Sequence, residues 1–178
     1  MSNIVLYKSK YGNTLQYAQW IAEDLGWELR DLSDFKRREI KNYQNIIFGS
    51  GVYIGKMNKI KKVLSWFKKK PIIIFACAGN NYDQKAIADI KTKNFTEDQL
   101  DFHKFFYLAG GIDFNKVTGI QRKMLNFFFK MIEKKSNRTS DEEEILNGFY
   151  NPSNYVDKAN LDDILAYARN LQTTNDFK

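Results

Sequence analysis

The sequence has few of the residues that build metal sites and catalytic triads. It contains one cysteine, Cys77, and one histidine, His103, among 178 residues. An intrachain disulfide and a cysteine-based zinc site are therefore excluded. A histidine-cluster metal site and a Ser-His-Asp triad with a spare histidine are poorly supported, and no metal site is expected. Any chemistry beyond simple binding would need a borrowed cofactor.

Long apolar runs are also missing. No run approaches the roughly 20 residues that are needed to span a bilayer. The N-terminus passes directly into the apolar run Ile4-Val5-Leu6, without the pattern of a signal peptide. We therefore expect a cytoplasmic protein. The 43% hydrophobic and 15% aromatic content and the length predict one packed domain over residues 1–178.

Acidic residues are the minority among the charged ones. The chain has 28 Lys and Arg against 21 Asp and Glu, a net charge of +7. Such a balance suits an anionic ligand, an anionic membrane surface or nucleic acid. Solubility alone is the alternative explanation for most of the lysines.

Five short apolar segments alternate with segments of helical periodicity. The predicted strands are residues 3–7, 27–31, 45–51, 71–77 and 104–108. The fourth is apolar throughout, as a parallel strand covered on both faces requires. This alternation predicts an α/β fold with a doubly wound, five-stranded parallel sheet in the order 2-1-3-4-5.

The last third is predicted to hold an insertion after the fifth strand, over about residues 110–157. A long helix is expected from about residue 116 to 134, with an apolar stripe and a lysine-rich side. Residues 136–157 are interpreted as a loop containing the acidic run 141–144. A final helix is predicted over 161–171, with Asn160 as N-cap, followed by a frayed tail.

Three polar loops follow the first, third and fourth predicted strands, at residues 9–14, 51–56 and 78–82. Ligands bind at the carboxyl ends of the strands in such sheets. The first loop, S-K-Y-G-N-T, precedes a helix, whose free N–H groups and dipole favour phosphate. The alternative is that Ser9, Asn13 or Thr14 merely caps the helix. Neither a P-loop nor a G-x-G-x-x-G motif is present, so a nucleoside triphosphate or NAD site is poorly supported.

The first loop resembles the flavodoxin phosphate signature, Ser/Thr-x-x-Gly-x-Thr, and the resemblance covers essentially the whole chain. It is closest to the flavodoxin-domain branch that includes the bacterial quinone-dependent protoporphyrinogen oxidase. In that branch the third strand ends in a G-S-G-I/V-Y-x-G-like loop, which resembles residues 49–55. The branch also carries an insertion with a long apolar and basic helix, similar to residues 110–136.

The resemblance implies an FMN site made by the three loops. Residues 9–14 would hold the phosphate, residues 52–55 would line one face of the isoalloxazine, and residues 79–82 would line the other face and its pyrimidine edge. The expected site residues are Ser9, Lys10, Tyr11, Gly12, Asn13, Thr14, Gly51, Val52, Tyr53, Ile54, Gly55, Ala78, Gly79, Asn80, Asn81 and Tyr82.

For several residues a purely structural role is the alternative to a functional one. Tyr53 would otherwise be an ordinary exposed loop aromatic, and Tyr82 would pack on the helix that follows it. Cys77 is expected to be a small core residue, and His103 to have a surface or capping role. The flavin loops offer no obvious acid–base residue, and no catalytic residue is assigned.

Three functions remain open. The first is an FMN oxidoreductase similar to the protoporphyrinogen oxidase, passing electrons to a quinone. The 116–134 helix would then contact the inner face of the membrane or a large apolar substrate, unless its stripe is simply core. The second is an electron carrier that docks on a redox partner protein, although such carriers are usually acidic. The third is a cofactor-free module that binds a protein or nucleic acid through residues 59–70; the intact first loop argues against it, and no nucleic acid is expected.

Overall fold

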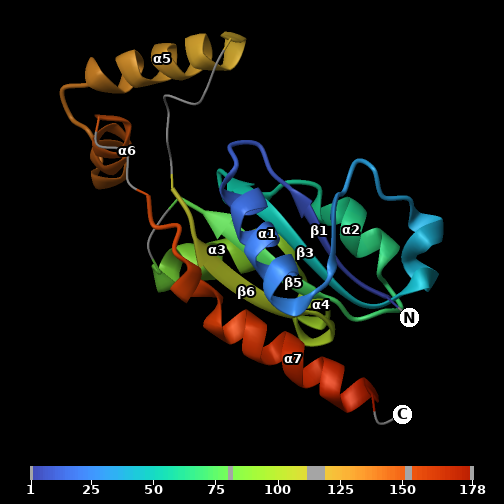
Figure 1. Cartoon of the computed structure of the whole chain (residues 1–178). Coiled ribbons are helices and arrows are strands. Elements are labelled where there is room, and N and C mark those ends of the chain that lie inside the picture. Colours follow the sequence, from blue (N-terminus) through green and yellow to red (C-terminus); the bar gives the residue numbers. More distant parts are fainter. Residues whose placement is uncertain (1, 80–81, 112–118, 151–153, 177–178) are drawn as a thin grey trace.

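The computed structural model describes residues 2–79, 82–111, 119–150 and 154–176, and shows a central sheet between two layers of helices (Figure 1). The parallel strands run in the order β2-β1-β3-β5-β6. Their bounds are β1 (Ser2–Lys8), β2 (Glu28–Asp31), β3 (Tyr43–Tyr53), β5 (Ile73–Ala78) and β6 (Lys104–Ala109). Since β5 and β6 are the fourth and fifth predicted strands, the predicted order 2-1-3-4-5 is confirmed. A short additional strand, β4 (Lys56–Met57), pairs antiparallel with β3.

Both faces of the sheet are covered by helices. On one face, α1 (Asn13–Leu25) and α7 (Asp162–Asp176) pack on the side chains of one core cluster. On the other face, α2 (Ile60–Trp66), α3 (Gln84–Asn94) and α4 (Glu97–Phe102) contribute to a second cluster. The strand β5 lies between the two clusters, and its side chains enter one cluster and the other in turn. Both of its faces are therefore buried or nearly so, which explains its uninterrupted apolar sequence.

The close approach of β3 and β5 depends on a glycine. Gly49 lies opposite Phe75 in the parallel register. A Cβ atom on Gly49 would lie 2.0 Å from Cζ of the Phe75 ring. The glycine therefore makes room for a large aromatic side chain in the middle of the sheet.

The single cysteine and the single histidine of the chain are both buried. Cys77 is a small core residue as predicted, and burial raises the pKa of its thiol to about 12. His103 is only 4% exposed, so a surface role is wrong, but the capping role is confirmed: His103 is the C-cap of α4, and its N–H donates to the Gln99 carbonyl oxygen at 2.9 Å. Its Nδ1 accepts a hydrogen bond of 3.3 Å from the Ile72 N–H, and burial lowers the pKa of the ring.

The insertion contains two helices, where the sequence predicted one helix and a loop. The long helix is confirmed as α5 (Gly119–Glu133), although the start expected near residue 116 lies outside the described residues. The predicted loop is wrong, because residues 140–150 form α6 (Ser140–Tyr150). A capping box begins this helix: Glu142 N–H donates to Thr139 Oγ1 at 3.3 Å, and Thr139 N–H donates to Glu142 Oε2 at 3.1 Å. The acidic run then lies in the first turn, where the helix dipole favours it.

The start and end of the final helix also differ from the prediction. Asn160 is not its N-cap, because a 3-10 turn, η3 (Lys158–Leu161), precedes α7 and is capped by the Asp157 carboxylate, which accepts from Ala159 N–H at 3.0 Å. The helix continues to Asp176, beyond the predicted end at residue 171. The segment between β2 and β3 holds another such turn, η1 (Arg37–Asn42). Across the described residues, we find no helix that is both long enough and apolar enough to cross a membrane.

Candidate functional site

The first predicted loop lies between β1 and the start of α1. Gly12 is the N-cap residue, with a φ of 98° that favours glycine, and no side chain caps the helix from this position. A Cβ atom on Gly12 would meet no atom within 4 Å, so the space in front of the helix start is open. The uncapped N–H groups and the helix dipole at this point suit a phosphate group.

The polar side chains of this loop make other contacts, so the alternative that they merely cap the helix does not match the structure. Ser9 Oγ accepts a hydrogen bond of 3.1 Å from the Gly12 N–H, which closes the loop on itself. Asn13 Nδ2 donates to the carbonyl oxygen of Gly111 at 2.7 Å. Thr14 is buried and its hydroxyl hydrogen-bonds with the Cys77 thiol. The first-turn N–H groups of α1 therefore have no side-chain acceptor among these three residues.

The second predicted loop is a β-hairpin rather than an open loop. Residues 51–53 belong to β3, and only Ile54 and Gly55 form the turn before β4. Both have left-handed backbones, with φ values of 51° and 73°. This conformation is unfavourable for a β-branched residue, and backbone strain of this kind is concentrated at functional sites. The Ile54 side chain is 96% exposed at the tip of the hairpin.

An asparagine from α3 holds this hairpin in place. Asn94 Nδ2 donates to the Gly55 carbonyl oxygen at 2.7 Å, and its Oδ1 accepts from the Met57 N–H at 2.8 Å. The side chain is buried, so these bonds fix the hairpin to the domain. Sequence reasoning missed Asn94, because its partners lie far away in the chain and no motif marks it.

Tyr53 leans from the hairpin toward the first loop. Its ring lies edge-on to Tyr11, with 5.8 Å between the ring centroids, and the Lys10 ammonium lies 5.5 Å from its centre. Its hydroxyl lies 2.9 Å from the position that a Cβ of Gly51 would take. Burial, and then the neighbouring Tyr11, raise the pKa of Tyr53 to about 12. Tyr53 is therefore a half-buried, neutral residue beside the first loop and not an ordinary exposed aromatic.

The third loop is described in part. Ala78 is the last residue of β5 and Gly79 follows it, whereas Asn80 and Asn81 lie outside the described residues. Tyr82 is half exposed, and its ring lies edge-on to Tyr107 of β6 at 5.5 Å. The side chain thus packs on the neighbouring strand, where packing on the following helix was the alternative.

A fourth segment, after β6, joins the site and was not predicted to belong to it. Gly110 N–H donates to the Ala78 carbonyl oxygen at 2.6 Å, and a Cβ on Gly110 would lie 2.8 Å from that oxygen. Gly111 accepts from Asn13 and pairs with Asn154 in an antiparallel bridge. The Gly-Gly pair after the fifth predicted strand could have indicated this segment from the sequence, because only glycine permits such a close approach of two backbones.

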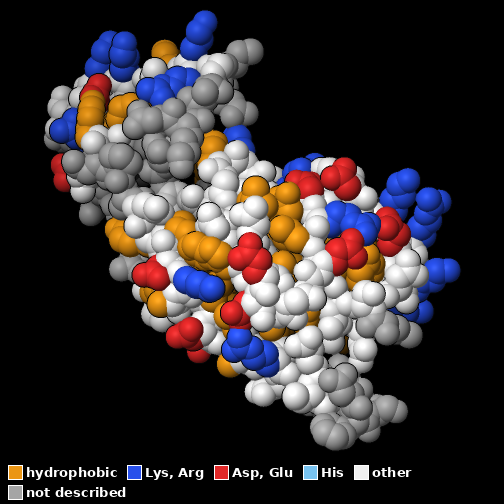
Figure 2. Space-filling model, in the orientation of Figure 1, with side chains coloured by type: hydrophobic (Ala, Val, Ile, Leu, Met, Phe, Trp, Pro, Cys, Tyr) orange, Lys and Arg blue, Asp and Glu red, His pale blue; other side chains and the backbone are white. Residues whose placement is uncertain are grey.

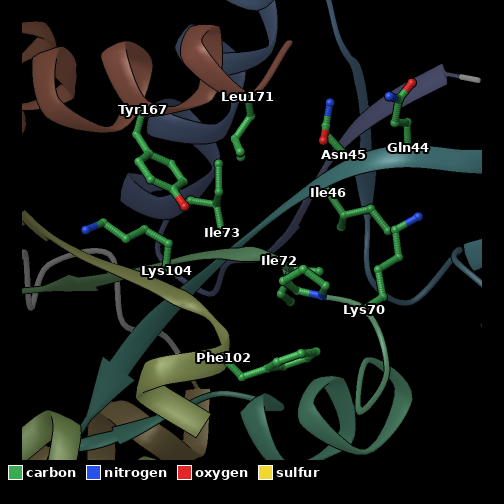
Figure 3. Close-up of a pocket in the computed structure, with 11 residues that line it drawn as sticks. Gln44, Asn45, Ile46, Lys70, Ile72, Ile73, Phe102, Lys104, Tyr167 and Leu171 are labelled. Atoms are coloured by element: carbon green, nitrogen blue, oxygen red, sulfur yellow. The ribbon is translucent and has the colours of Figure 1, made fainter. Parts of the chain in front are cut away.

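The amino ends of the strands, at the opposite end of the sheet, carry a separate hollow of about 340 Å³ (Figure 3). Lys70 and Lys104 line it, together with Ile73, Phe102 and Tyr167. The Lys70 ammonium donates to the Tyr43 carbonyl oxygen, and the Lys104 ammonium lies 5.2 Å from the centre of the Tyr167 ring. Both cations thus make contacts with the surrounding protein, and the hollow has no part in the loop site. Among the described residues, no group of three or more His, Cys, Asp and Glu side chains is placed to hold a metal ion.

Residues 4–140 match the family model of the flavodoxin domain. The chain belongs to the flavodoxin domain family. It is also 33% identical, over 150 residues, to an uncharacterized protein of Methanocaldococcus jannaschii; the aligned part covers 75% of this chain and 99% of that protein.

Solved structures with flavodoxin-like folds match at lower identity. A flavodoxin from the domain Archaea is 20% identical, covering 62% of this chain and 85% of that one, with a TM-score of 0.42. Flavodoxin 2 from Bacillus cereus is 17% identical, covering 76% of this chain and 100% of that one, with a TM-score of 0.42. The Trp repressor binding protein from Bacillus subtilis is 19% identical, covering 61% and 83%, with a TM-score of 0.44.

Proposed function

We propose that this flavodoxin domain binds FMN and acts as an FMN-dependent oxidoreductase. The observation that carries the proposal is the start of α1, where Gly12 leaves the helix uncapped and the space before it open. A phosphate monoester carries the charge and acceptor oxygens that such a helix start stabilises. Residues 9–14 would hold the phosphate, with the Lys10 ammonium adding a positive charge.

The hairpin and the third loop would hold the ring system. Tyr53 and the exposed Ile54 offer an aromatic and an apolar surface on one side, and residues 79–82 would lie on the other. Bound FMN would supply the redox chemistry by accepting electrons and passing them on. The chain's own part would be to bind and orient the ring, with Asn94 fixing the hairpin through its bonds to Gly55 and Met57.

The loop residues do not provide a general base at neutral pH. The sixteen expected site residues include no Asp, Glu or His. Tyr53, with its pKa raised to about 12, keeps its proton. We therefore infer a substrate that gives up electrons without a protein base, and we propose a protoporphyrinogen oxidase-like reaction with a quinone as acceptor. The resemblance of residues 49–55 to that branch supports this finer assignment.

FMN retention tests the proposal. Purified protein is mixed with excess FMN, desalted, and its visible spectrum recorded. We expect a retained and shifted flavin band in the wild type, and loss of retention in Gly12→Asp, because the new carboxylate would occupy and repel the phosphate position. A colourless wild-type protein, with riboflavin and FAD also failing, would overturn the proposal and favour the cofactor-free module.

Gly26→Asp is the matched control. Gly26 lies after the other end of α1, also with a positive φ, 66°, and a Cβ atom at this position would likewise meet no atom within 4 Å. Both variants therefore place a non-glycine residue in a left-handed backbone, which costs about 1–2 kcal/mol. Only Gly12→Asp should lose the flavin; equal loss in both variants would mean that backbone strain, and not the phosphate position, is responsible.

An electron carrier that docks on redox proteins is the second candidate. The absence of an acid–base side chain among the site residues favours it, because a carrier needs none. The flavin-loaded protein is tested for oxidation of a porphyrinogen with a quinone present, and for reduction by a flavodoxin reductase. Porphyrinogen turnover favours the enzyme, whereas rapid exchange with the reductase and no turnover favours the carrier.

A further inference from the structure

The helix α5 has an apolar face that the rest of the described chain leaves uncovered. Phe127, Phe128 and Met131, which we call the α5 apolar face, are 72%, 42% and 49% exposed. The adjacent side of the helix is the one that packs, with Phe129 and Ile132 buried. The Phe129 ring stacks on Phe149 of α6 at 4.0 Å. The alternative that Phe127, Phe128 and Met131 are core is therefore wrong.

Lysines border this face. Lys123, Phe127, Lys130 and Lys134 follow one another at spacings of four, three and four, so they share one side of the helix. All three lysines are exposed. Figure 2 shows basic and hydrophobic side chains together at this end of the molecule. Long lysine side chains beside an apolar face suit a boundary between hydrocarbon and water, because the ammonium groups can reach the water.

The charge of the segment points to the kind of partner. Residues 119–138 contain six Lys or Arg and one Glu, a net charge of +5. The one acid, Glu133, accepts a hydrogen bond from the Tyr150 hydroxyl. A second copy of this helix would bring like charges together, whereas anionic headgroups would neutralise them.

We propose that the α5 apolar face docks on an anionic lipid surface, with the helix lying in the plane of the interface. With 15 residues at about 1.5 Å each, α5 is shorter than the roughly 30 Å hydrocarbon core, and its basic side belongs in the headgroup region. The α5–α6 pair has its own small core and stands apart from the sheet in Figure 1, and the exposed fractions show that the α5 apolar face is open to solvent.

The base of the α5–α6 pair connects this surface to the proposed flavin site. The chain leaves the sheet at Gly111 and returns at Asn154, and these residues pair with each other. Gly111 also accepts from Asn13 at the start of α1. The docking surface and the carboxyl ends of the strands thus lie at one end of the molecule, which would favour exchange with a lipid-dissolved electron acceptor such as the proposed quinone.

Vesicle co-sedimentation tests the docking, using the full chain with and without added FMN. We expect the wild type to sediment with vesicles of phosphatidylserine and phosphatidylcholine, and not with pure phosphatidylcholine. The triple variant Phe127→Ser, Phe128→Ser, Met131→Ser should bind at least about tenfold more weakly, and its circular dichroism should be unchanged because the three side chains are exposed.

Matched charge variants separate the α5 surface from general basicity. Lys123→Glu, Lys130→Glu, Lys134→Glu should lose binding, while Lys61→Glu, Lys68→Glu, Lys69→Glu, exposed lysines on and after α2, should keep most of it. Wild-type protein that stays in the supernatant with anionic vesicles at low salt would overturn the docking, as would a triple serine variant that binds like the wild type. Self-association that disappears in the serine variant, without vesicle binding, would overturn it in favour of a second copy.

The experiments can refute the docking proposal and the proposed function independently of each other. Vesicle binding by a protein that retains no FMN would leave the docking surface and remove the oxidoreductase. FMN retention without vesicle binding would leave the flavin site and remove the lipid surface.

Discussion

At the residue scale, His103 is a buried polar group whose environment favours its uncharged form. Its Nδ1 accepts the Ile72 N–H, and the ring lies edge-on to Phe102, with 4.9 Å between centroids. A protonated ring would lose this acceptor and would carry a charge in a poorly hydrated place. Burial accordingly lowers the pKa of His103 from its ordinary value of 6.5.

We expect this histidine to make the fold sensitive to mild acid. Its pKa is lower in the folded state than in the unfolded state, so the unfolded chain binds the extra proton below about pH 6.5 and stability falls as the pH drops. Above that pH the histidine is neutral in both the folded and the unfolded state, and its stabilising contribution is fully present. His103→Gln, which does not titrate, should flatten the decrease in the free energy of unfolding between about pH 7.5 and pH 5.5. The free energy of unfolding is measured by urea denaturation at each pH. If it decreases equally in the two proteins across this range, the assignment is contradicted.

At the element scale, the helix α6 shows how a polar sequence can still form a regular element. Its buried contacts come from Leu146, and the ring of Phe149 completes the small core with α5. Among the described side chains of α6, Leu146 and Phe149 are the ones that join this core. The capping box of Thr139 and Glu142, with the ion pair between Glu142 and Lys135, stabilises its start.

Thr139→Ala should loosen the α5–α6 pair and leave the sheet unaffected. Removing the hydroxyl acceptor for the Glu142 N–H should cost about 0.5–2 kcal/mol of local stability. Hydrogen exchange followed by mass spectrometry is expected to show faster exchange in α6 and the facing part of α5. Thr96→Ala is the control, since it removes the equivalent hydroxyl from the capping box of α4. Exchange that accelerates equally in the sheet would show that the pair is not a separate unit.

The elements of this fold differ in how far the sequence predicts them. The strands are predictable because a parallel strand covered on both faces has a continuous apolar sequence, as residues 73–77 do. The loops of the candidate site follow from the rule that carboxyl strand ends share one edge of the sheet. The hairpin turn at Ile54, the anchor Asn94 and the contact of Asn13 with Gly111 depend on side chains that meet across long sequence separations, and no local pattern encodes them.

At the scale of the whole molecule, one hydroxyl joins three distant parts of the chain. Tyr17, fully buried on α1, donates to the Ala109 carbonyl oxygen of β6 at 2.6 Å. It accepts from Asn160 Nδ2 at 2.7 Å and from the Asp157 N–H at 3.3 Å. The segment that leads from the insertion into α7 is therefore fixed to both the sheet and the first helix.

Tyr17→Phe should weaken the attachment of the C-terminal part to the domain. The change leaves a buried carbonyl and two donors without this partner, which typically costs about 1–3 kcal/mol. We expect a lower free energy of unfolding and faster amide exchange at residues 157–160. Tyr155→Phe is the comparison, because its hydroxyl takes no part in these bonds. If both variants are equally stable, the Tyr17 hydroxyl is not the connection that the geometry indicates.

The pairing of Gly111 with Asn154 has a consequence for the history of this chain. Everything between these two residues leaves and re-enters the domain through adjacent points, so exchanging it for a short connection would add little loop-closure entropy and would break few contacts of the sheet. Such a segment can be acquired, lengthened or lost as a cassette during evolution. The end of the sheet that carries the candidate site would then have been free to stay the same while the surface presented beside it changed.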